Sequence, residues 1–439
     1  MDGTFIALCK SLSKPLPTKP VLKRARSNQS TSAKKVSTAS KTIDEPWHNL
    51  MTEVMNIFKG DTQVPSFDDS TLSGYHGMIY NYAVNIASDP QALATSTTTQ
   101  YDICVALSGI VNATMEAPKL YYDSVTLDRV KSLCRKQFFS DITKLHLLED
   151  TLVPLRHAYS SGETPSLHMA VKKDEAMNMT MGTIPPLIQS VTSELISYLC
   201  QFKLPPLHDS PEFDFVSKWT HVLEIVTQHK LRFWSGELAS TATKDQSAFL
   251  ESALNAEMAA PYGRKLDLQL RAKSCSLLKD TMLELNNSEF KKHDTSPTDL
   301  AIQRRKNILV NHAMLVQLNT LINFPLDDVE VLFLDVRGWV ANIFCLTKMD
   351  DVWACDVVCE NPILLPYDTN SWEDFLKGPS IAMLWNYGQY LISYYNMVLK
   401  QDMQKLKEQH SNLCDTSDKT LSLGQFTFLP TKSRLKPAQ

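Results

Sequence analysis

Three charged side chains in one short stretch of the chain are the residues best suited to do chemistry. Asp267 lies in the run KLDLQL, and Glu289 and Lys291 end the run TMLELNNSEFK. Because side chains alternate along an extended chain, Glu289 and Lys291 point to the same side of a strand. If the two runs pair as a hairpin, two carboxylates and one ammonium meet at a single point.

Such a group suits metal-dependent hydrolysis of a phosphodiester. Two carboxylates, here Asp267 and Glu289, are typical ligands of Mg²⁺, which keeps several waters for a substrate phosphate to displace. A bound metal ion lowers the pKa of its water and neutralises charge on the attacked phosphate. We therefore expect Mg²⁺ as the cofactor, with Lys291 orienting the attacking water and stabilising the developing anion. The alternative interpretation is two half-buried strands whose charges only face solvent.

Further polar residues follow in the predicted helix over residues 298–322. Gln303, on its first turns, is predicted to help hold the catalytic arrangement. The basic run Arg304, Arg305 and Lys306 is predicted to contact phosphates, and a solvated helix face is the alternative.

Glu284 competes with Glu289 for the role of metal ligand. The residue two positions after Glu284 is Asn286, whereas the residue two positions after Glu289 is Lys291. The choice depends on the strand register, because a bulge within the sequence LNNS re-aims one of the two carboxylates. Both acids therefore stay candidates.

The elements around these residues predict a mixed sheet with helices packed against it. After a Pro-rich joint at 204–211, the chain shows helical patterns over 211–230, 244–260, 298–322 and 380–409, and strand patterns over 231–237, 264–272, 281–291, 329–346 and 352–365. Before the joint the patterns are helical, over 46–60, 100–117, 127–160 and 185–202.

The expected fold class is therefore α+β, with an N-terminal helical region followed by a mixed-sheet domain. The predicted division is a disordered basic tail at 1–43, a helical domain at 44–204, an α/β domain at 205–410 and a C-terminal tail at 411–439.

The order of elements and charged residues resembles the PD-(D/E)XK nuclease superfamily over residues 205–400. The resemblance implies a restriction-endonuclease-like domain flanked by helices, in which Asp267 and Glu289 bind the metal and Lys291 assists the attacking water. It also implies that Glu212, at the start of PEFDFVSKW, supports the site. The chain departs from the family pattern at Leu266, where the family has proline, and at the polar LNN before Glu-x-Lys. It is also similar to a group of fungal proteins that share GRKLDL, ELNNSEFK and LDVRG segments.

Charge is distributed unevenly along the chain. Residues 1–43 contain nine Lys or Arg and one Asp, a net charge of +8, so the remainder of a chain with net charge −4 carries −12. Within this tail, five basic residues resemble a bipartite nuclear import signal that an import receptor would bind: Lys23, Arg24, Arg26, Lys34 and Lys35. We expect a nuclear protein, with the cytoplasm as the alternative.

The nine cysteines are scattered, which favours buried thiols in a reducing compartment. No apolar run reaches the roughly 18 residues of a membrane span, so we expect no membrane partner.

Three functions stay open on the sequence alone. The first is an active nuclease that cuts DNA or RNA. The second is a nuclease-like fold that binds nucleic acid without turnover, since a fold does not imply an activity. The third is a non-enzymatic interaction protein whose helical segment 44–204 binds protein partners of unknown identity.

Overall fold

The computed structural model describes ten segments of the chain: residues 43–60, 63–65, 72–114, 121–136, 186–201, 210–254, 263–277, 281–327, 329–411 and 423–429. The predicted import signal and almost all of the two predicted tails lie outside these residues. So does the part of the expected helix over 127–160 that follows Lys136.

Eight strands of the described residues form one mixed sheet in the order β1-β7-β6-β5-β4-β3-β2, with β8 beside β6. Their bounds are Ile110–Asn112 (β1), Phe233–Ala239 (β2), Lys265–Lys273 (β3), Met282–Lys291 (β4), Glu330–Arg337 (β5), Val340–Met349 (β6), Val352–Val357 (β7) and Ile363–Leu364 (β8). The pairs β1·β7 and β4·β5 are parallel, and the other pairs are antiparallel. The predicted α+β class with a mixed sheet is confirmed.

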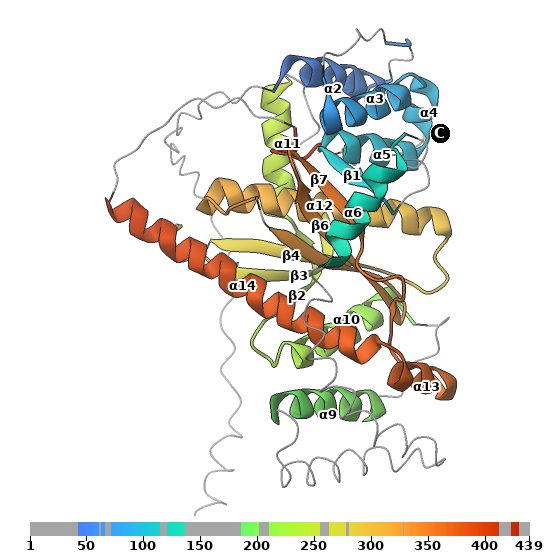
Figure 1. The fold of residues 1–439 in the computed structure, drawn as a ribbon, viewed down its shortest axis with the longest axis vertical. Coiled ribbons are helices and arrows are strands. Elements are labelled where there is room, and N and C mark those ends of the chain that lie inside the picture. Colours follow the sequence, from blue (N-terminus) through green and yellow to red (C-terminus); the bar gives the residue numbers. More distant parts are fainter. Residues whose placement is uncertain are drawn as a thin grey trace, which may run out of the picture. The chain divides into compact units, whose positions relative to one another are not determined.

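The helices of the described residues pack on this sheet or on one another (Figure 1). Their bounds are Glu45–Phe58 (α2), Gly74–Ala87 (α3), Pro90–Thr95 (α4), Thr97–Leu107 (α5), Ser124–Lys136 (α6), Pro186–Gln201 (α9), Glu212–Val226 (α10), Thr241–Ala253 (α11), Pro297–Ile322 (α12), Thr369–Lys377 (α13) and Ser380–Ser411 (α14). In this part of the chain, no helix has both the length and the apolar character needed to cross a membrane.

Strand β4 lies between two helical layers, and its side chains alternate between them. The Asn287 side chain donates to Asn307 of α12, whereas the Ser288 side chain lies beside the Tyr387 hydroxyl of α14. This alternation follows from the two-residue repeat of an extended chain. It places Glu289, two residues beyond Asn287, on the face that α12 covers.

The predicted helix over 100–117 is wrong in its second half. Helix α5 ends at Leu107, Gly109 adopts φ +71°, and the next three residues form β1 beside β7. A Cβ atom at Gly109 would lie 2.8 Å from the backbone nitrogen of Gly424, so this turn requires glycine. A three-residue apolar strand is too short for its periodicity to be read apart from the helix before it.

The N-terminal helices share the core of the sheet. Helix α5 packs on α12, and α6 packs on β6 and β7. One cluster of buried apolar side chains extends from Ile43 to Leu429, so described residues on both sides of position 204 belong to it. The expected boundary near residue 204 therefore does not separate two cores.

Candidate active site

Three carboxylates lie at the same end of three neighbouring strands. Glu289 of β4 and Asp335 of β5 are level in the parallel ladder. On the other side of β4, the antiparallel ladder with β3 has Leu268 opposite Ser288, and Asp267 is the next residue along. The backbone N–H of Phe290 donates to Asp267 Oδ2 at 2.9 Å, so the Asp267 carboxylate continues the ladder where backbone pairing ends.

Burial, with a smaller effect of neighbouring charge, raises the pKa of two of these acids. Burial and then the nearby Glu289 carboxylate raise the pKa of Asp267 to about 6. Burial raises the pKa of Asp335 to about 7; the Arg304 guanidinium and Gln303 oppose this rise, and Glu289 adds to it. Burial disfavours the charged form of both acids, and Glu289 adds repulsion that a nearby cation would offset.

Glu289 itself is held on both oxygens. Its side chain is 1% exposed, Lys306 Nζ lies 2.6 Å from Oε2, and Asn287 Nδ2 donates to Oε1 at 3.0 Å. Lys306 Nζ also donates to the backbone carbonyl of Lys265 at 3.2 Å. Lys306 therefore acts as the counter-ion of Glu289. The expected phosphate contact requires a lysine on a free surface, and Lys306 is not placed there.

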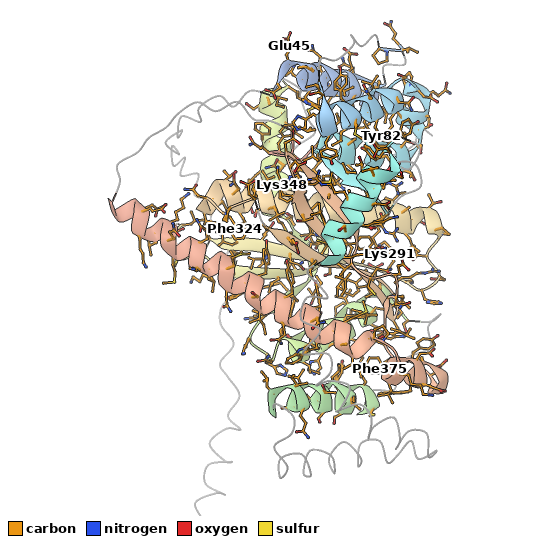
Figure 2. All side chains as sticks on the ribbon, viewed as in Figure 1. Glu45, Tyr82, Lys291, Phe324, Lys348 and Phe375 are labelled. Atoms are coloured by element: carbon orange, nitrogen blue, oxygen red, sulfur yellow. The ribbon has the colours of Figure 1, made fainter. Side chains whose placement is uncertain are left out.

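Lys291 ends β4 and connects the site to α10 (Figure 2 labels its position). Its Nζ lies 3.3 Å from Glu212 Oε2 and donates to the carbonyl of Phe290 at 2.9 Å. The backbone of Phe290 thus donates to Asp267 and accepts from Lys291. The structure brings Glu212, Asp267, Glu289 and Lys291 together around this one residue.

Gln303 and Arg304 approach Asp335. Gln303 Nε2 donates to Asp335 Oδ1 at 2.7 Å, and Arg304 Nε lies 3.8 Å from Oδ2. The Arg304 guanidinium carbon also lies 5.1 Å from the centre of the Phe344 ring. Gln303 therefore positions Asp335. Its described hydrogen bond is with Asp335 and not with Asp267 or Glu289, the predicted pair of acids.

Arg305 lies away from the site. Its side chain is 7% exposed, and its guanidinium donates two hydrogen bonds to Asp102 of α5, at 2.5 and 3.2 Å. Successive helical residues differ by about 100° around the axis, so three consecutive basic residues cannot share one face. The expected phosphate contact of Arg305 does not fit this placement, because Arg305 joins α12 to α5.

Glu284 caps a helix instead of joining the acids. The backbone N–H groups of Thr241 and Ala242 donate to its carboxylate at 2.9 and 3.1 Å, and Ser240 Oγ donates at 2.7 Å. The register of β3 and β4 shifts between Leu270 and Arg271, opposite Glu284 and Asn286, which is the bulge that the sequence left open. The structure therefore places Glu289, and not Glu284, beside Asp267.

Sequence reasoning missed the asparagines behind Glu289. Asn287 Nδ2 donates to Asn307 Oδ1 at 3.1 Å, and Asn311 Nδ2 donates to the same oxygen at 2.9 Å. Asn307 Nδ2 donates to the carbonyl of Leu334 at 2.8 Å, where β4 and β5 are not paired. The signal was present: LNN interrupts an apolar strand, and Asn307 and Asn311 are four residues apart on one helical face.

Comparison with family models, with curated proteins and with solved structures finds no match. The chemistry of the site is therefore inferred from its own residues.

The donor chemistry of the site fits a hard divalent cation. Asp267 and Glu289 offer carboxylate oxygens at adjacent strand ends, and burial and then the Glu289 carboxylate raise the pKa of Asp267, so a cation there would stabilise its charged form. No group of three or more His, Cys, Asp or Glu in the described segments is suited to hold a metal ion. Mg²⁺ does not require one, because one or two carboxylates, waters and substrate phosphates usually complete its coordination.

The buried Asp335 predicts a specific dependence of stability on pH. The pKa of Asp335 is about 7 in the folded chain, compared with 3.8 for an aspartate in an unfolded chain. Between about pH 4 and pH 7 the folded state therefore keeps a proton that the unfolded state has lost. Stability should therefore fall as pH rises from about 4 to above 7. At pH 8, Asp335→Asn should raise the free energy of unfolding by about 2–4 kcal/mol, and at pH 4 by much less.

Urea unfolding of both proteins across this pH range measures the difference. Asp128→Asn is the control, because the Asp128 side chain on α6 is 75% exposed and its replacement should leave the pH dependence of stability unchanged. Parallel stability curves for the wild type and Asp335→Asn would contradict the assignment.

Proposed function

We propose that this chain is a metal-dependent nuclease with a restriction-endonuclease-like fold. The observation that carries the proposal is the meeting of Asp267, Glu289 and Lys291 at one strand end, with Glu212 beside the lysine. These four residues come from α10, β3 and β4, in the order that the resemblance to PD-(D/E)XK nucleases implies.

The connectivity supports the same proposal. Helix α10 precedes the antiparallel strands β2, β3 and β4, with α11 inserted between β2 and β3. Helix α12 then crosses over to β5, which lies parallel to β4. A parallel neighbour needs such a crossover, and it brings α12 across the face that carries Glu289.

In the proposed reaction, water adds to phosphorus, the bond from phosphorus to the leaving oxygen breaks, and the leaving oxygen takes up a proton. Mg²⁺ held by Asp267 and Glu289 would supply a water of lowered pKa and positive charge beside the phosphate. Lys291 orients the attacking water and offsets developing negative charge, and Glu212 fixes its ammonium. Asn287 fixes the rotamer of Glu289.

One observation favours a second candidate, a nuclease-like fold that binds nucleic acid without turnover. The ammonium of Lys306 already neutralises Glu289, at 2.6 Å, so the folded chain balances this charge without a metal ion. The two candidates differ in their response to divalent cations.

The deciding experiment combines melting with cleavage. Mg²⁺ or Mn²⁺ should raise the melting temperature of the wild type but not that of Asp267→Ala, because only the wild type retains both carboxylates. Labelled single- and double-stranded DNA and RNA should be cut by the wild type in the presence of the metal. An equal response of both melting temperatures would overturn the metal site and, together with nucleic-acid binding, would favour the second candidate. A wild-type response without cleavage would overturn the nuclease activity.

The tail supplies a separate prediction about substrate binding. Residues 44–439 carry a net charge of −12, so we expect the basic tail to contribute much of the attraction to a polyanion. If the tail neutralises about six phosphates, affinity should fall roughly a thousandfold between 50 and 200 mM salt. Deletion of residues 1–43 should flatten this dependence in fluorescence anisotropy titrations, and an unchanged slope would contradict a role for the tail.

A further inference from the structure

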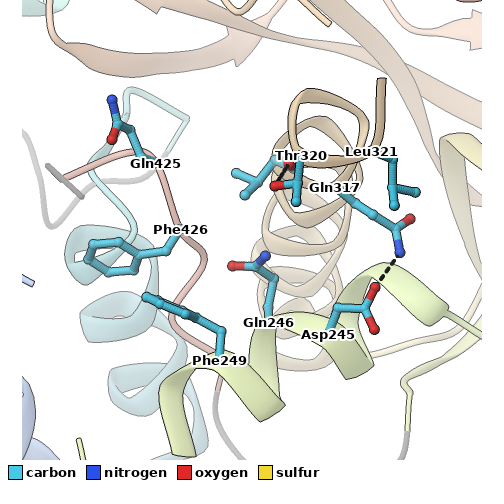
Figure 3. Close-up of a pocket in the computed structure, with 9 residues that line it drawn as sticks. Asp245, Gln246, Phe249, Gln317, Thr320, Leu321, Gln425 and Phe426 are labelled. Atoms are coloured by element: carbon cyan, nitrogen blue, oxygen red, sulfur yellow. Dashed lines mark hydrogen bonds between the residues drawn. The ribbon is translucent and has the colours of Figure 1, made fainter. Parts of the chain in front are cut away.

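A pocket of about 140 Å³ lies between α11, α12 and the segment 423–429 (Figure 3). It is remote from the candidate active site. Gln317, which lines the pocket, comes 14 residues after Gln303 on the same helix, a separation of roughly 20 Å at 1.5 Å per residue. The pocket therefore needs an explanation of its own.

One residue of the pocket wall, Gln317, has a buried hydrogen-bond acceptor that the described residues leave unpaired. Gln317 is 5% exposed, and its Nε2 donates to Asp245 Oδ2 at 2.7 Å and to Thr241 Oγ1 at 3.3 Å. These two acceptors fix the orientation of the amide, which leaves Oε1 without a partner in the described part of the chain. An unsatisfied buried carbonyl is costly, so Oε1 favours a ligand that donates a hydrogen bond.

The charge of the residues that line the pocket determines which sign of charge a ligand should carry. Asp245 is the one charged residue among the described residues that line the pocket, and it is exposed at the rim. Its carboxylate accepts a hydrogen bond from the amide of Gln317, and this neutral donor does not balance its negative charge. A donor group that carries positive charge would satisfy both Asp245 and Gln317.

The remaining walls are apolar and aromatic. Phe249 and Phe426 face the pocket with ring centres 6.0 Å apart, and Val316 and Leu321 of α12 complete the apolar lining. A cavity of about 150 Å³ accommodates a molecule the size of benzene. One aromatic ring therefore fits the available volume, and aromatic walls also attract a cation.

We propose that this pocket binds a single-ring aromatic cation, with its ring against Phe249 and Phe426 and its positively charged N–H groups bonded to Asp245 and Gln317. The site is independent of the proposed nuclease activity.

Benzamidine and benzoate, which share a ring and a planar head group but carry opposite charges, test the proposal on the full chain. Ligand-detected NMR titration should give benzamidine a dissociation constant on the order of 1 mM, typical of a ligand with few atoms. Benzoate should show no saturable binding. Equal binding of the two probes, or no binding of benzamidine up to roughly 20-fold above that concentration, would overturn the proposal.

Two exposed substitutions locate the binding without disturbing the core. Asp245→Asn removes the charge, and Thr320→Lys places a competing cation at the rim; each should weaken benzamidine binding at least about tenfold. Glu251→Gln, also on α11 but outside the lining, is the matched control and should leave binding unchanged. Binding that neither rim substitution weakens would place benzamidine elsewhere and overturn the assignment. A bound water would satisfy Gln317 Oε1 equally well, but it would not make the pocket prefer benzamidine to benzoate.

Discussion

Asp267→Asn and Glu289→Gln should each lower Mg²⁺-dependent cleavage by at least about a thousandfold. Both substitutions keep the size and one hydrogen-bonding oxygen of the side chain. Asparagine at 267 can still accept from the N–H of Phe290, and glutamine at 289 can still accept from Asn287. The loss therefore arises from the charge that holds the metal, and three decades in rate correspond to about 4 kcal/mol of transition-state stabilisation, the range expected of a Lewis-acid metal.

The two site variants need a control variant at a partly buried acid outside the site. Glu330→Gln changes a half-buried carboxyl on β5, at the opposite end of the strand from Asp335, and should retain wild-type cleavage. Single-turnover rates at saturating Mg²⁺ and at tenfold higher Mn²⁺ separate weakened metal binding from lost chemistry. Cleavage by Asp267→Asn within tenfold of the wild type, at both metal concentrations, would show that the carboxylate is not a metal ligand.

Local sequence patterns predicted the elements of this site because those elements are long and regular. The pattern over 281–291 corresponds to β4 at Met282–Lys291, and the pattern over 298–322 corresponds to α12 at Pro297–Ile322. Strand alternation alone placed Glu289 and Lys291 on one side. These predictions needed no knowledge of which strands are neighbours.

The contacts that the sequence did not predict depend on pairings between distant segments. Asp335 reaches Glu289 only because β5 lies parallel to β4 in one particular register, which local periodicity does not encode. Arg305 is buried because Asp102, two hundred residues earlier, faces it from α5. Glu284 and Glu289 were distinguished by a single bulge, which no residue type in LNNS specifies by itself.

Lys306→Met should produce the largest loss of stability among the site variants. Lys306 is the cation that lies 2.6 Å from Glu289, whose side chain is 1% exposed, so methionine leaves a buried carboxylate without its counter-ion. Breaking one side of a buried ion pair costs about 3–5 kcal/mol. Chemical unfolding at low ionic strength, without divalent cations, measures this cost.

The double variant Lys306→Met/Glu289→Gln separates charge from packing. Glutamine keeps the contact with Asn287 but needs no counter-ion, so the double variant should recover most of the stability that Lys306→Met loses. A double variant as unstable as the single one would show that Lys306 acts through its aliphatic stem.

Divalent cations should reverse the loss in the single variant alone. When the ammonium of Lys306 is removed, Mg²⁺ no longer competes with an internal cation for Glu289. The protein should then bind Mg²⁺ more tightly, and tighter binding stabilises the folded state more. The rise in melting temperature with Mg²⁺ should therefore be greater for Lys306→Met than for the wild type, and absent in Lys306→Met/Glu289→Gln. A smaller rise in the single variant would mean that Lys306 helps to build the metal site. In that case the ion pair would belong to the active form of the protein and would not be a substitute for the metal.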